Sequence, residues 1–266
     1  MNLSTTVKQN PVTSFIILTL GLSFAAFLLP VSQESAFTAV VSVDVMIPTI
    51  VAFVLVTLMQ GRQGTVAFLR QTFRWHIPLK WYVIVLGVGG IVPVGTSVLA
   101  LVTGRISVIE IAAPNAFVIA IFLFALLEEI GWRGFALRRL LDQHTPFTAT
   151  LIVGIPWALL HFALWVVFVP DVSPIGEGLV VLTLALAHTW IYIRSGRSVL
   201  AATLLHGAVN SFGSIAIAAI LPEEAIWFSL ASAALVSAAL LLIDWRMWFA
   251  SPNEDMLPEA LPSTAT

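Results

Sequence analysis

The chain of 266 residues is 59% hydrophobic and only 10% charged, and its mean hydropathy is +1.00. A soluble protein of this size needs polar residues over most of its surface, and soluble domains carry about 25% charged residues. The composition therefore excludes a soluble globular protein and predicts a polytopic membrane protein. The chain has no Cys, which excludes disulfides, thiolate metal sites and Cys nucleophiles. A net charge of −2 gives no basic footprint for nucleic acid.

Apolar stretches of about 17–25 residues are long enough to cross a bilayer as helices. In chain order, eight stretches have this character: Val12–Leu29, Ala36–Met59, Trp81–Val102, Ile111–Leu127, Phe147–Val169, Leu179–Ile193, Val199–Leu221 and Ala225–Ile243. We therefore predict an all-α bundle of about eight transmembrane helices, forming a single domain over residues 1–250. Ser251 to Thr266 is predicted to be a short polar tail.

Basic residues predict how the spans are oriented. With eight spans, both termini and every second connection share one side, and eleven of the twelve Lys and Arg residues fall there. Only Arg105 falls on the other side. Because cytoplasmic loops of membrane proteins are enriched in Lys and Arg, we predict that both termini are cytoplasmic.

The connection between the second and third spans has the pattern of a helix on the membrane surface. Val66, Leu69 and Phe73 recur at helical spacing between several arginines. An apolar face beside a basic one suits the interface of lipid and water. We predict an amphipathic surface helix at about residues 62–78, with a plain basic loop as the alternative.

Ionisable side chains inside a bilayer are costly and usually functional. The predicted spans hold Asp44, His161, His188 and His206, and Glu128 and Glu129 stand at the end of the fourth span. At about 1.5 Å per helical residue, Glu129, His161 and His206 lie at similar depths, displaced from the centre toward the cytoplasm. This convergence predicts one site shared by three helices, with Asn210 one turn after His206.

Two of these residues lack a partner motif. His188 is predicted to make an interhelical hydrogen bond rather than to serve the site. Asp44 lies nearer the outer face and is predicted to be structural or to face a wet crevice.

Glu128 and Glu129 are predicted to have different roles, because adjacent residues on a helix point about 100° apart. Arg133 follows Glu129 by four residues, so it can pair with that carboxylate and keep it ionised. Glu128 has no cation near it in the sequence and is the better candidate for a general base. Trp132, four residues after Glu128, is predicted to wall its pocket.

These motifs resemble those of a known family. Glu128-Glu129-x-x-x-Arg133, Trp157-x-x-x-His161 and His206-x-x-x-Asn210 are similar, in order and spacing, to three signature motifs of the CPBP family. Its members are intramembrane proteases related to type II CAAX prenyl endopeptidases and to bacteriocin-immunity proteins. The likeness covers about residues 115–215. Trp157 departs from the pattern, since Phe is usual there, and this puts the shape of the pocket wall in doubt.

The resemblance implies hydrolysis of a peptide bond inside a membrane-embedded chamber that opens toward the cytoplasm. It implies that Glu128 and His161 activate a water molecule, and that His206 and Asn210 stabilise the oxyanion. The expected partners are membrane lipid and a membrane-associated, lipid-modified peptide, of which prenylated peptides are one class; nucleic acid is not expected. It also implies that Glu129 and Arg133 hold the architecture of the site. Trp132 and Trp157 are expected to line the substrate pocket.

The need for a metal stays open at the level of sequence. Glu128, His161 and His206 form a donor set of the kind that holds a catalytic Zn²⁺ ion. No His-Glu-x-x-His motif is present, and the residues serve equally well without a metal, so direct activation of water is slightly favoured.

Two other functions compete with proteolysis. The first is a membrane scaffold or bacteriocin-immunity protein that retains the site without catalysis. The second is a proton-coupled transporter, for which ionisable groups in the membrane are also expected. Transporters usually contain repeated halves, and the first half of this chain holds no second copy of the motifs.

Overall fold

A computed structural model describes residues 7–28, 40–74, 76–109, 117–168, 172–216 and 222–252. Every regular element in these ranges is a helix, which confirms the all-α prediction. The elements are α2 (Pro11–Phe27), α4 (Ile47–Thr72), α5 (Leu79–Val102), α6 (Phe117–Glu129), the π-helix η1 (Ile130–Leu137), α7 (Arg138–Leu140), α8 (Pro146–Phe168), α9 (Pro174–Arg194), α10 (Val199–Ala216), α11 (Pro222–Ile243) and α12 (Trp245–Phe249).

Each of the eight predicted spans overlaps a helix. Within the described ranges, five helices are long and apolar enough to cross a membrane, over Val40–Thr72, Leu79–Val102, Pro146–Phe168, Pro174–Arg194 and Glu223–Ile243. Shorter apolar helices cover Pro11–Phe27 and Val199–Gly213. Some predicted ends lie outside the described residues: Leu29, Ala36, Ile111, Val169, Leu221 and the tail beyond residue 252.

A break at Gly61 divides α4 into two helical parts. Gly61 has φ 64° and ψ −163°, a backbone conformation that residues other than glycine rarely adopt. The second part ends at Thr72 rather than near residue 78, and Pro78 is the residue that precedes α5. The position of this helix on a membrane surface stays a prediction.

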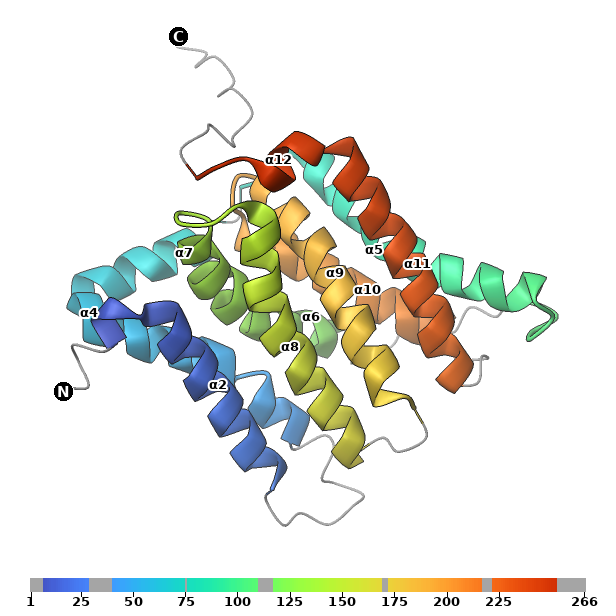
Figure 1. The fold of residues 1–266 in the computed structure, drawn as a ribbon, viewed down its shortest axis with the longest axis horizontal. Coiled ribbons are helices and arrows are strands. Elements are labelled where there is room, and N and C mark those ends of the chain that lie inside the picture. Colours follow the sequence, from blue (N-terminus) through green and yellow to red (C-terminus); the bar gives the residue numbers. More distant parts are fainter. Residues whose placement is uncertain are drawn as a thin grey trace, which may run out of the picture.

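The helices run side by side as a bundle, with α2 and α4 on one side and α5 and α11 on the other (Figure 1). Helix α8 packs along α9, while α10 packs along both α5 and α6. The continuous helical path from α6 through η1 to α7 contacts α4, α8 and α10, so it lies inside the bundle. This segment carries the first of the three sequence motifs.

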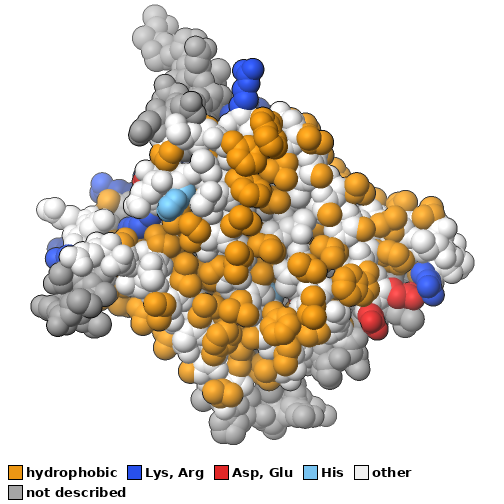
Figure 2. Space-filling model, in the orientation of Figure 1, with side chains coloured by type: hydrophobic (Ala, Val, Ile, Leu, Met, Phe, Trp, Pro, Cys, Tyr) orange, Lys and Arg blue, Asp and Glu red, His pale blue; other side chains and the backbone are white. Residues whose placement is uncertain are grey.

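The outer surface has the character expected of a protein surrounded by lipid. Figure 2 shows a face covered largely by hydrophobic side chains, with the charged side chains at its margins. Large apolar residues such as Leu79, Leu123 and Leu235 are more than half exposed. Such an apolar surface is unfavourable in water and favourable against acyl chains.

A charged cluster ties the end of α9 to the junction of α11 and α12. Asp244 accepts hydrogen bonds from the Arg194 guanidinium and, at 2.8 Å, from Trp190 Nε1. Burial alone would raise the pKa of Asp244, but the bonds from Arg194 and Trp190 outweigh burial and hold this pKa below its ordinary value.

Candidate active site

The first motif lies where the α-helix α6 changes to the wider π-helix η1. All eight residues of η1 are buried, so neighbouring helices surround it on every side. Gly131 makes this possible, since a Cβ at that position would lie about 2.5 Å from Pro48 at the start of α4. Isolated π-helical turns often occur at functional sites.

Glu129 is the centre of a buried polar network. Its side chain is 0% exposed, and Oε1 accepts a hydrogen bond from Arg133 Nη1 at 2.7 Å. The same oxygen accepts a hydrogen bond from His206 Nδ1 at 3.0 Å. The predicted pair of Glu129 and Arg133 is therefore present in the structure, and the third motif joins it from α10.

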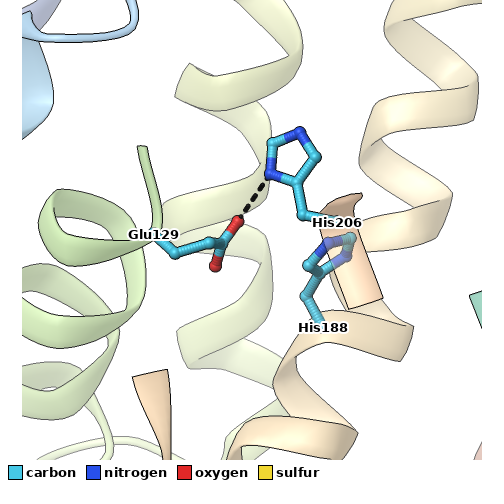
Figure 3. A group of neighbouring side chains, drawn as sticks. All are labelled: Glu129, His188 and His206. Carbon is cyan, nitrogen blue, oxygen red and sulfur yellow. Dashed lines mark hydrogen bonds and ion pairs between the residues drawn. The ribbon is translucent and has the colours of Figure 1, made fainter. Parts of the chain in front are cut away.

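His188 also belongs to this network, although its sequence context did not predict a place in the site. It is 1% exposed, and its Nδ1 donates to the Leu184 carbonyl oxygen at 2.8 Å, which leaves Nε2 as an acceptor. Figure 3 shows Glu129, His188 and His206 approaching one another from three elements. Glu129 Oε2 and His188 Nε2 are buried and have no partner in the part of the chain that the structure describes.

Trp157 connects the two glutamates and the histidines. Its Nε1 donates to Glu128 Oε2 at 2.8 Å, a bond that the usual Phe could not make. The Arg133 guanidinium lies over the indole ring at 4.2 Å from its centroid. The centroids of the His161, His188 and His206 rings lie 5.3–5.5 Å from that of Trp157.

His161 is oriented by its own helix. Its Nδ1 donates to the Trp157 carbonyl oxygen at 3.0 Å, so Nε2 is left as the acceptor of the neutral ring. The imidazole is half-buried and faces a cavity rather than a second protein group.

A cavity of about 610 Å³ joins these residues. Most of its lining is apolar, as is usual for sites that bind small molecules or peptide side chains. The predicted residues that line it are Glu128, Trp157, His161, His206 and Asn210. Asp44, Glu177 and His188 line it as well.

Three predicted residues do not line this cavity. Glu129 and Arg133 are buried behind it, in keeping with a supporting position. Trp132 was predicted to wall the pocket, but it is fully buried and packs edge-on against Phe15 at 5.2 Å. The π-helix explains this difference, because its wider turn changes the direction in which a residue four positions after Glu128 points.

The candidate metal ligands also differ from those predicted. Glu129, His188 and His206 offer ligand atoms within 4.8 Å of one another, whereas the predicted set was Glu128, His161 and His206. Two His and one carboxylate form a donor set that suits Zn²⁺, and the unpartnered Glu129 Oε2 and His188 Nε2 are free to bind an ion. The donor set therefore fits a zinc ion, although Arg133 already balances the charge of Glu129.

Two residues that line the cavity, His188 and Glu177, belong to none of the sequence motifs, so the sequence did not indicate them. His188 is held by a backbone carbonyl of its own helix, and its neighbours come from η1, α8 and α10. Glu177 lies in the first turn of α9, where an acidic residue is common in any helix. The predicted span begins at Leu179, so Glu177 lies outside it, in a connection between spans.

Comparisons with known proteins agree with the motifs. Residues 110–212 match the family described as type II CAAX prenyl endopeptidase Rce1-like. A protein named CAAX prenyl protease 2, from Methanococcus maripaludis, is 29% identical over 143 residues. That alignment covers 48% of this chain and 50% of the relative, so the chain spans about half the length of the curated relative that it matches.

All three motifs fall inside the matched region, and their side chains meet around one cavity and the buried network behind it. Through residues 110–212, this chain is similar to the Rce1-like type II CAAX prenyl endopeptidases, which agrees with the resemblance of its three motifs to those of the CPBP family.

Proposed function

We propose that this protein is an intramembrane endopeptidase that hydrolyses a peptide bond of a membrane-associated, lipid-modified polypeptide. One observation carries the proposal: Glu128, His161, His206 and Asn210 come from α6, α8 and α10 and line a single cavity. The name of the Methanococcus maripaludis relative supports proteolysis as the reaction.

Glu128 and His161 are the groups that activate water in this proposal. A water molecule between them loses a proton to Glu128 as its oxygen attacks the carbonyl carbon of the substrate. His161 presents the Nε2 acceptor that its bond to the Trp157 carbonyl leaves available. The proton then passes to the amine nitrogen as the C–N bond breaks, which restores the carboxylate.

His206 and Asn210 are positioned to stabilise the negative charge on the carbonyl oxygen. His206 donates from Nδ1 to Glu129, so a protonated ring can donate from Nε2 as well. Glu129 Oε1 accepts the Nδ1–H bond and fixes the orientation of that ring. Asn210 lies one helical turn further along α10 and supplies an amide N–H.

A zinc ion is the alternative way to activate water. Bound by Glu129, His188 and His206, it would supply a Lewis acid that lowers the pKa of a bound water. The pairing of Glu129 with Arg133 leads us to favour direct activation by Glu128 and His161. Activity that survives a strong chelator is the expected result.

The apolar lining of the cavity suits the acyl or prenyl chain of a lipid-modified substrate. The distribution of Lys and Arg supports access from the cytoplasmic side. Both features support a substrate among polypeptides held at the cytoplasmic surface of a membrane.

Substitution of the proposed base tests the function. In purified protein reconstituted in lipid, Glu128→Gln is expected to lower the cleavage of a lipid-modified reporter peptide at least about 100-fold, because general base catalysis typically contributes that much. His161→Ala and His206→Ala are expected to abolish cleavage too. Mass spectrometry of the products measures the rate.

Glu223→Gln is the matched control, since it makes the same change at an exposed residue in the first turn of α11. Cleavage by Glu128→Gln at the wild-type rate would overturn the assignment. A scaffold or immunity function predicts instead that the Glu128→Gln protein still complements a deletion strain.

A further inference from the structure

We propose that the cavity selects a substrate segment carrying a lysine or arginine side chain close to the bond that is cleaved, and disfavours a carboxylate there. This inference rests on the proposed function and adds the chemistry of the substrate to it. It arises from groups in the cavity that the proposed reaction does not use.

Apart from the histidines, the ionisable side chains that face the cavity are all acidic. Among the described residues that line it, the carboxylates are Asp44, Glu128 and Glu177, and none is Lys or Arg. Glu128 is assigned to the activation of water. Asp44 and Glu177 therefore leave two carboxylates on the cavity wall with no assigned task and no cation beside them on that wall.

Asp44 and Glu177 line the same cavity as Glu128 and His161. Gly178, the residue after Glu177, packs against α8 on both sides of His161, since a Cβ there would lie 3.6 Å from the Ala158 carbonyl oxygen and from Phe162 Cβ. A substrate side chain that reaches Glu177 would therefore belong to a residue near the bond that is cleaved.

A further polar group on the wall is also an acceptor. His188 is 1% exposed, and its Nε2 is an acceptor without a partner in the described part of the chain. Acceptors that face an apolar cavity favour a ligand that brings donors. An ammonium or guanidinium group has several donors, no acceptor and the opposite charge to Asp44 and Glu177.

The apolar walls fit the rest of such a side chain. Val180, Val181 and Leu184 follow Glu177 along α9 and line the same cavity. The methylene stem of Lys or Arg can pack on this surface while its charged end reaches the carboxylates. A carboxylate placed there would meet like charges in surroundings of low dielectric constant, which strengthens the repulsion.

Three reporter peptides test the inference. They share one lipid-modified sequence and differ at a single position, occupied by Lys, Gln or Glu, within two residues of the bond that the full-length wild-type protein cleaves in the Gln peptide. We expect kcat/KM to be at least tenfold higher for the Lys peptide than for the Glu peptide. Glu177→Gln is expected to bring that ratio below about threefold, and Glu177→Asp to keep it.

Asp44→Asn provides a second variant if Glu177→Gln does not fold, and Glu223→Gln is the control that keeps the ratio. Equal rates for the three peptides, or an unchanged ratio in both Glu177→Gln and Asp44→Asn, would overturn the inference while leaving proteolysis intact.

Binding separates this inference from the proposed function. The Kd values of the Lys and Glu peptides for Glu128→Gln protein in lipid nanodiscs report charge preference without turnover. If the wild-type protein cleaves no peptide but Glu128→Gln binds the Lys peptide at least tenfold more tightly, the proteolytic function fails and the charge preference stands. Equal binding of both peptides contradicts the charge preference.

Discussion

At the scale of single residues, Trp157 distinguishes this site from the usual pattern of the family that its motifs resemble. Its indole N–H holds Glu128 Oε2 at 2.8 Å, and its ring lies beneath the Arg133 guanidinium. A phenyl ring could keep the second contact but not the first. We infer that Trp157 positions the proposed base, and that the substitution strengthens the site rather than merely reshaping its wall.

Trp157→Phe tests this positioning. Loss of a hydrogen bond to a charged group should lower kcat about tenfold, with little change in KM, because the ring and the cavity remain. Steady-state kinetics on the Gln reporter peptide measure both constants. Trp190→Phe is the matched control, since it removes an indole N–H that binds Asp244 outside the cavity. A kcat within twofold of wild type for Trp157→Phe would contradict the role.

The residues of the site could be predicted to the extent that they belong to motifs. Charge at bilayer depth indicated Glu128, Glu129, His161 and His206, because few side chains are placed there without use. His188 and Glu177 were missed as members of the cavity wall, because their neighbours come from other helices. A sequence shows depth along a helix, but it does not show which face of that helix meets the cavity.

At the scale of elements, the π-helix η1 determines what the first motif can reach. Spacing of four residues correctly predicted that Glu129 pairs with Arg133, but the same spacing placed Trp132 wrongly. An α-helical pattern cannot indicate where a helix widens.

Helix α9 begins earlier than the predicted span. The span was predicted to start at Leu179, whereas the helix starts at Pro174, because the Ser173 hydroxyl caps it by accepting a hydrogen bond from Gly176 N–H at 3.1 Å.

Gly131→Ala tests the close packing of η1. The added methyl group would overlap the backbone of Pro48, which is 2.6 Å away, and overpacking of this kind costs about 1–3 kcal/mol. We expect the melting temperature of the protein in detergent to fall by about 5 °C. Gly87→Ala is the control, because nothing lies within 4 Å of its Cβ position and alanine favours a helix. Equal melting temperatures for the two variants would contradict the packing argument.

At the scale of the whole molecule, composition predicted the class of protein because so apolar a chain has few folds available. The helices confirm an all-α bundle, and the apolar exterior agrees with a membrane location. Only the distribution of Lys and Arg indicates which side of the bundle faces the cytoplasm, because the fold by itself does not distinguish the two sides of a membrane. The orientation therefore stays a prediction.

Thiol labelling tests the orientation without background, since the chain has no Cys. Gln143 and Ser107 are both exposed and lie in connections predicted to be on opposite sides. In intact cells, a membrane-impermeant maleimide should label Ser107→Cys, and it should label Gln143→Cys only after the membrane is permeabilised. The reverse pattern would invert the predicted topology.

The crossing that bears the proposed base has a consequence for biogenesis. Within one pass, Phe117–Leu140 contains Glu128, Glu129 and Arg133, and each charged residue near the middle of a lone helix opposes insertion by about 2.5–3.5 kcal/mol. Glu129 gains its bond to His206 only when a helix 77 residues further along has been synthesised. We therefore expect this segment to become stably inserted in the bilayer late, when α10 arrives, so that its insertion is coupled to the assembly of the buried network.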